Sequence, residues 1–466
     1  MPEYIRQELK FVLPDIKGVR DAARGSHWVK SLREEYLPSP SEDIKKYEKY
    51  LKRAYFVRAT GATIEGYTSS VFRKPISVRG NAANELVNID GVGSDIQAYC
   101  NRVFRELLMG GRVAQWITPL NDGEYYLSPY KSEQLINWTP QRFAVFHEKA
   151  RKGDIAIDYV DQLRVLRREA EGVRLGTTEL NAPIGLDDDA GIQLSDNPPQ
   201  DSLLRWVGQF PVIPITPSGI GYDPSSITLA PLAEANFDHY TLSADLRQGL
   251  HTAPFPVFFA AGFGTDKDLT IGPDKAWVAK GAGPNAAAGV LEYRGWALEW
   301  LLQTLTKTEG FLISFGARML EHDKRATETA EALKTRQASQ EANIIGLVRA
   351  CSAGVTLGCK TLLAYRNNTT IDRIDLDIDL PTDLIETRLT SDELIALVTA
   401  WIKGAITDEQ LEFNYRQGEL IPPHQSKDDY LAALTESRMR AEAAEARLRI
   451  MAERRAGDAD AGRPSS

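Results

Sequence analysis

The clearest helical pattern of the chain lies in 296–320, where apolar residues recur every three or four positions. A second broad apolar face predicts a helix over 226–251, which Pro254 ends. The residues between these two helices form short strand-like pieces separated by Gly, Pro and Asp. This order predicts two antiparallel helices with a small β-region at their tip.

A further long helical pattern covers 332–365, after a polar bridge at 321–331. This pattern is rich in small residues, which permit close approach of a neighbouring element. Because Gly354 and Gly358 lie inside it, we expect a kinked helix.

The remaining segments mix strands and helices. Alternation of apolar and polar residues across 112–220, with turn residues between the runs, predicts strands, and strict alternation over 371–380 predicts one more. Helical patterns cover 57–75 and 94–110, the second with Ser94 as its expected cap. Helices are also expected at 391–404, 408–418 and 428–455. The whole pattern is that of an α+β protein.

Composition narrows the class of protein. The chain has 466 residues and a net charge of −9, so it is not a basic polyanion-binding protein overall, although a local basic site is compatible with this charge. Its three cysteines form no disulfide framework or CxxC pair, which indicates a reducing compartment. The charged N-terminus lacks the apolar core of a secretory signal, and we expect no membrane-spanning segment.

Candidate chemistry is sparse. The six histidines show no HExxH or HxH spacing and the chain has no Walker A motif, so we expect no catalytic site, metal or cofactor. Asp187, Asp188 and Asp189 are best explained as a solvated loop. A basic cluster surrounds the polar bridge and alternates with acids, which by itself favours a solvated turn over phosphate binding. Its members are Arg318, Lys324, Arg325, Lys334 and Arg336.

Three functional classes remain open from the residues. One is a soluble α+β enzyme with an insertion, such as an enzyme that modifies nucleic acid, which would need convergent titratable groups in a pocket. Another is a ring component of a virion such as an adaptor, although adaptors are generally much shorter than this chain. The third is the family that the chain resembles, and the order of the long helices supports it.

The chain resembles the portal proteins of tailed bacteriophages, in a branch long catalogued as a domain of unknown function. The resemblance lies in the order of several stretches rather than in one motif, and it spans roughly 40–390. These stretches are RATGATIEGYTSSVFRKP at 58–75, RELLMGGR at 105–112, SEQLINW at 132–138, NFDHYTLSADLRQGLHTAPFPVFFAAG at 236–262 and the GPDKAWV…LEYRG…GARML run at 272–320.

The resemblance implies a ring, usually of twelve copies, around a DNA channel. It divides the chain into an α/β wing, an antiparallel two-helix stem, a small α/β clip, a kinked tunnel helix and a helical crown. The implied ranges are wing 1–225, stem helices 226–251 and 296–320, clip 252–295, tunnel loop 321–331, tunnel helix 332–365, wing return strand 366–389, crown 390–455 and a disordered tail 456–466.

The resemblance also implies partners and contact residues. Lys324, Arg325, Lys334 and Arg336 would touch double-stranded DNA weakly and without sequence preference, with Arg318 at the top of the stem. The clip would dock the terminase large subunit and the head–tail adaptor, and the ring would meet the major capsid protein or a scaffold. The expected location is the portal vertex of the virion, after assembly in the host cytoplasm. The candidate clip contacts are Trp277, Lys275 and Lys280.

Overall fold

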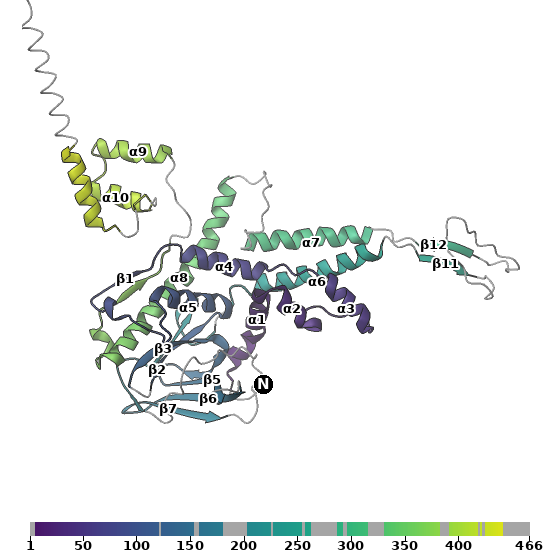
Figure 1. Ribbon diagram of the computed structural model, residues 1–466, viewed down its shortest axis with the longest axis horizontal. Coiled ribbons are helices and arrows are strands. Elements are labelled where there is room, and N and C mark those ends of the chain that lie inside the picture. Colours follow the sequence, from purple (N-terminus) through teal and green to yellow (C-terminus); the bar gives the residue numbers. More distant parts are fainter. Residues whose placement is uncertain are drawn as a thin grey trace, which may run out of the picture. The chain divides into compact units, whose positions relative to one another are not determined.

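The computed structural model of the chain is drawn in Figure 1. It describes residues 5–120, 123–152, 158–179, 203–224, 227–253, 257–261, 287–291, 296–315, 330–382, 391–417, 420–421 and 425–440. The chain forms two compact units. The first comprises Met1–Phe72 and Ile76–Thr382, and the second comprises Arg73–Pro75 and Asp383–Ser466.

The first unit begins with five α-helices, whose ends follow local sequence signals. The predicted cap of the fifth helix is wrong by one residue, because the Asp95 carboxylate and not Ser94 accepts the Ala98 N–H. Gly111 ends that helix in the left-handed region, with φ 62°. The helices are α1 (Gln7–Arg24), α2 (Ser26–Ser31), α3 (Ile44–Arg53), α4 (Ala59–Val71) and α5 (Ile96–Gly110).

The predicted β-region forms two antiparallel sheets. One has the order β10-β9-β2-β3 and the other β4-β5-β6-β7-β8. The first is formed by β2 (Val113–Pro119), β3 (Tyr125–Lys131), β9 (Val212–Thr216) and β10 (Gly219–Ile220). The second is formed by β4 (Leu135–Thr139), β5 (Phe143–Lys152), β6 (Asp158–Arg168), β7 (Gly172–Glu179) and β8 (Leu203–Arg205).

Helix α8 (Ala330–Arg366) packs on the first sheet and runs without interruption through both glycines at which we expected a kink. These glycines instead permit close packing. A Cβ on Gly354 would collide with the buried Ile215 side chain of β9, and one on Gly358 would come within 2.9 Å of Gln115 of β2. The small residues at these two positions are therefore explained by contacts within one chain. Because α8 begins at Ala330, the last two residues of the expected 321–331 loop are helical.

The strand predicted over 371–380 is much shorter than its alternating pattern. Residues Ile371–Arg373 form a short 3-10 helix (η5), and only Asp377–Asp379 form a strand, β13, which pairs antiparallel with β1 (Ser77–Arg79). The Ile371 N–H donates to the Val207 carbonyl instead of to a partner strand, and this contact prevents an extended ladder. The pattern gave the correct faces, because Ile378 is buried and Asp377 is exposed.

The predicted helical pair is present as α6 (Ala230–Thr252) and α7 (Trp296–Phe315), which pack side by side (Figure 1). Between them in sequence lie two paired strands, β11 (Val257–Ala261) and β12 (Ala287–Leu291). The pairing is antiparallel, with Val257 opposite Leu291 and Ala261 opposite Ala287.

The second unit contains α9 (Ser391–Ile402), α10 (Asp408–Gln417) and a helix over 427–440. The indole N–H of Trp401 donates to the Asp408 carboxylate at 2.6 Å, and the Arg438 guanidinium pairs with the same carboxylate at 3.1 Å. These contacts join all three helices. The expected tail at 456–466 lies outside the described residues.

One stretch, Asn343–Arg366 of α8, is long and apolar enough to cross a membrane by length and composition. In the fold, 67% of its most apolar window is buried. Cys351 and Cys359 are both fully buried within it. The stretch is therefore the central helix of the first unit's core.

Candidate functional site

Helix α6 is held in place along one side by the N-terminal helices. The Tyr36 and Phe237 rings stack at 3.9 Å, and the Asn236 amide donates to the Val57 carbonyl at 2.8 Å. Further along, the Tyr50 hydroxyl donates to the Asp245 carboxylate at 2.6 Å. Burial, together with this carboxylate, raises the pKa of Tyr50 well above its usual value, so the phenol remains a donor. These contacts fix α6 as a rigid support.

The other side of α6 packs on α7 through leucines. Leu246, Leu298 and Leu305 form the buried cluster between the two helices. A Cβ on Gly249 would collide with Leu298, so this glycine lets the helices approach closely. His239 adds one polar contact, with its Nε2 3.3 Å from a carboxylate oxygen of Glu309. The α6–α7 pair is consequently a packed hairpin of helices.

Helix α7 carries a second apolar face, which the described residues of the chain leave exposed. Trp296, Trp300 and Phe311 are 67%, 65% and 43% exposed, respectively. At 3.6 residues per turn, these three residues lie on the side opposite the leucines that pack on α6. Large apolar groups gathered on one exposed helix face are typical of an interface with another molecule. We refer to Trp296, Trp300 and Phe311 as the outer face of α7.

The paired strands β11 and β12 are also apolar, and some of their large side chains are exposed. Their ten residues are Val, Phe, Leu, Ala and Gly, without the alternation that a sheet with one wet face shows. Phe259 and Val290 are 41% and 46% exposed. A two-stranded sheet is at best marginally stable in water, and its exposed apolar side chains make this strand pair a candidate interface.

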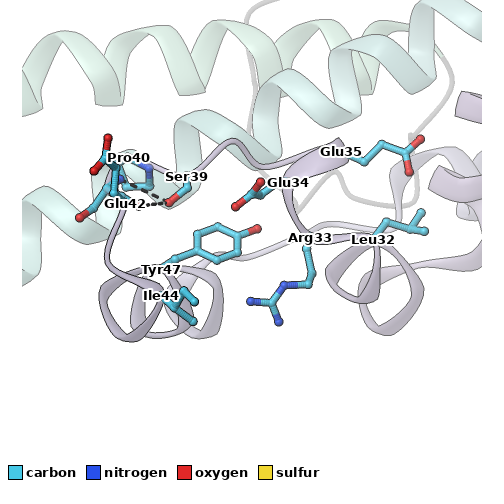
Figure 2. Close-up of a pocket in the computed structure, with 10 residues that line it drawn as sticks. Leu32, Arg33, Glu34, Glu35, Ser39, Pro40, Glu42, Ile44 and Tyr47 are labelled. Carbon is cyan, nitrogen blue, oxygen red and sulfur yellow. Dashed lines mark hydrogen bonds between the residues drawn. The ribbon is translucent and has the colours of Figure 1, made fainter.

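An open groove of about 790 Å³ lies between the α2–η1 segment and α3, where η1 is the 3-10 helix Arg33–Glu35 (Figure 2). Arg33 already pairs with Glu48 at 2.9 Å and lies over the Tyr47 ring. Ser39 donates to the Ser41 carbonyl. Arg33 and Ser39 therefore already have partners within the chain.

One cluster of buried charged groups joins the second sheet to the first. The Glu148 carboxylate receives hydrogen bonds from Arg164 Nε at 2.9 Å and from the Tyr130 hydroxyl at 2.7 Å. His147 Nε2 lies 2.8 Å from Asp161, and burial lowers the pKa of this histidine. In the part of the chain that the structure describes, no group of three or more His, Cys, Asp or Glu side chains could hold a metal ion.

The structure leaves most sequence-predicted contact residues untested. Arg318, Lys324 and Arg325 lie outside the described residues, as do Asp187, Asp188 and Asp189 of the solvated-loop interpretation. Lys334 and Arg336 lie in the first two turns of α8, and the structure describes only the backbone of this part of the helix. The clip candidates Trp277, Lys275 and Lys280 fall between β11 and β12, also outside the described residues.

Two surfaces escaped prediction at residue level. The sequence indicates a broad apolar face on 296–320, but only the structure separates the leucines that meet α6 from the outer face of α7. The run IKKYEKYLKR at 44–53 places several lysines on one side of α3. This spacing could have identified the lysine-bearing side of the helix from the sequence.

Comparison with known proteins gives distant matches. The family described as "Domain of unknown function (DUF4055)" matches residues 228–365, which contain α6, α7 and nearly all of α8. That description names no activity. No curated protein matches the sequence.

Solved structures that match the chain distantly come from gene transfer agent particles. A chain from the neck of a native particle, computed with C12 symmetry, is 10% identical, with a TM-score of 0.38 over 76% of this chain and 88% of that chain. A chain from the neck of an empty particle, computed with C6 symmetry, is 9% identical, with a TM-score of 0.39 over 83% and 96%. A chain from the native virion is 9% identical, with a TM-score of 0.39 over 82% and 96%.

Proposed function

We propose that this chain is a bacteriophage portal protein. It forms a non-enzymatic ring at one capsid vertex, through which double-stranded DNA is packaged, retained and ejected. The ring is a dodecamer that docks the terminase large subunit during packaging and the head–tail adaptor afterwards. It contacts the major capsid protein or a scaffold during assembly.

The outer face of α7 is the observation that carries this proposal. One side of α7 packs on α6, which is itself held by the N-terminal helices, and the opposite side exposes Trp296, Trp300 and Phe311. In a ring, each helical pair has a neighbour on both sides, so a second apolar face is buried against the next copy.

The order of elements supports the same assignment. A helical pair with an apolar strand pair between its helices is followed by a polar segment and then by the long helix α8. The exposed Phe259 and Val290 of the strand pair would be covered by neighbouring copies and by the docked terminase or adaptor.

The net negative charge of the chain suits a channel through which DNA moves better than a site that binds DNA tightly. Each phosphate contact adds affinity through counterion release, and many contacts would stall moving DNA. A ring of acidic chains, each with a net charge of −9, with a few cations at its narrowest part surrounds DNA without gripping it. Lys324, Arg325, Lys334 and Arg336 are the proposed weak contacts, and Arg318 lies at the stem end of this segment.

The mass of the assembled protein in solution tests the proposal directly. We expect a particle whose mass is near twelve times the 51.8 kDa of one chain, with an axial channel in projection images. A monomer or a closed dimer without a channel contradicts the portal assignment and returns the enzyme class to first place.

A further inference from the structure

Helix α3 carries a row of lysines on its exposed side. Lys45, Lys49 and Lys52 are spaced by four and three residues, so they lie on one face of the helix, over about 10 Å of its length. All three are exposed, while Tyr47 and Tyr50 bury the opposite face. We call Lys45, Lys49 and Lys52 the lysine row.

The lysine row is not neutralised by the chain itself. Among the residues that the structure describes, none of its three ammonium groups forms an ion pair, and the nearby Glu48 pairs with Arg33 instead. Like charges three and four residues apart destabilise a helix. A protein with a net charge of −9 has many carboxylates that could have paired with this row.

Cations from neighbouring helices extend this surface. The Arg247 guanidinium of α6 donates to the Arg53 carbonyl at the end of α3 and lies over the Tyr55 ring. Lys30 of α2 has a lowered pKa, first because it is partly buried and then because of the positive charge on Arg247. Arg247 therefore lies at the C-terminal end of α3 and is close enough to Lys30 of α2 to lower its pKa.

We propose that the lysine row, with Arg247 beside its C-terminal end, is a binding surface for the phosphate backbone of double-stranded DNA. Lysine ammonium groups on flexible stems make point-charge contacts with phosphates, which suits binding without sequence preference. This contact goes beyond the proposed portal function, because it lies on α3 and not in the 321–331 segment assigned to the channel. It requires neither the ring nor the channel.

The chemistry of the surface favours DNA over two other anionic partners. Protein interfaces are depleted in lysine and enriched in aromatic residues, whereas Tyr47 and Tyr50 of α3 are buried. A helix that binds a membrane inserts its apolar face, and the apolar face of α3 is already packed inside the protein. A row of exposed lysines, on a helix whose only acidic residue, Glu48, is paired with Arg33, matches a polyphosphate backbone.

Binding of a short fluorescent DNA duplex to the full-length protein, measured over a range of salt concentrations, tests the proposal. The variant K45Q/K49Q/K52Q removes the row, while the buried tyrosines of α3 stay in place. Each lost phosphate contact lowers the slope of log K against log salt by about 0.9, so we expect a decrease of nearly three. At moderate salt the affinity falls on the order of a hundredfold.

The control is K10Q/K360Q/K403Q, which removes the same charge from α1, from α8 and from the turn after α9. We expect this variant to keep the wild-type slope. The proposal is overturned if the row variant keeps its affinity and slope, or if the scattered variant loses as much. It is also overturned if polyglutamate or phosphatidylglycerol vesicles bind the row as tightly as DNA does. The ring proposal stands or falls separately, on the mass of each variant.

Discussion

Gly354 and Gly346 lie on the same helix, α8, in different surroundings. A Cβ on Gly354 would collide with Ile215, which is fully buried and β-branched and cannot move aside, whereas a Cβ on Gly346 meets nothing within 4 Å. We expect Gly354→Ala to lower the free energy of unfolding of the first unit by about 1–3 kcal/mol. Gly346→Ala should raise it by up to about 1 kcal/mol through helix propensity. Thermal denaturation of the two variants gives opposite shifts, and equal shifts would show that α8 does not pack closely on β9.

His147 gives the fold a predictable sensitivity to acid. Burial lowers its pKa in the folded state, opposed by Asp161 and Glu148 and assisted by Lys149, so the unfolded chain binds a proton more readily. The stability that depends on neutral His147 is complete above the unfolded pKa of about 6.5 and is lost as the pH falls below it. We expect His147→Gln to flatten the decline of the denaturation midpoint between about pH 7 and pH 5.

Exposed His27 is the control for this pH dependence. His27→Gln should leave the decline of the midpoint as steep as in the unaltered protein. If the two variants have the same pH profile, the acid sensitivity of the fold arises from other groups.

Among the helices, α7 has two apolar faces, of which one packs on α6 and the other is exposed. We expect Trp296→Glu with Trp300→Glu to leave a folded protomer, because both side chains are exposed in a single chain, but to abolish rings. Burial of two unpaired carboxylates at each subunit contact costs several kcal/mol. Mass measurement reports whether rings form, and circular dichroism reports whether the protomer is folded.

Phe11→Glu supplies the comparison for α7. Phe11 is 85% exposed on α1, so the substitution makes an apolar-to-acidic change on a different helix. Rings should persist in this variant. Intact rings in the double tryptophan variant would exclude the outer face of α7 as the subunit interface.

Sequence periodicity was sufficient for the elements that are long and amphipathic. The helices α6, α7 and α8 and the two sheets follow from patterns that local physics determines. Short elements were predicted wrongly where a contact distant in sequence determines their structure. The Ile371 N–H, for example, donates to the Val207 carbonyl. Helix α1 escaped because Pro14 lies inside it, a residue that normally argues against a helix.

The candidate site was predictable to a lesser degree. That 296–320 has an apolar face is visible in the sequence, but which residues meet α6 depends on the contact between Gly249 and Leu298. The kink expected at Gly354 was wrong, because this glycine instead admits the Ile215 side chain of β9. A small residue permits close approach, and the sequence does not say whether the approaching group is in the same chain.

For the whole molecule, the proposed ring turns a modest charge per chain into a strong field around the channel. In this setting the few cations of the 321–331 segment matter because acids surround them, namely Glu321, Asp323 and Glu328. Removing Lys324 and Arg325 leaves a purely repulsive stretch near the DNA. DNA that has entered should then be held less well.

We therefore expect Lys324→Ala with Arg325→Ala to assemble rings of normal mass that package or retain less DNA. The measurement is the nuclease-protected DNA per particle, compared with particles carrying K10Q/K360Q/K403Q, in which the lost charges lie on other elements. Full heads from the double variant would remove these two residues from the mechanism, while the ring itself is judged by its mass. Reduced DNA with intact rings would assign the constriction to this segment, since subunit assembly and DNA retention would then depend on different parts of the chain.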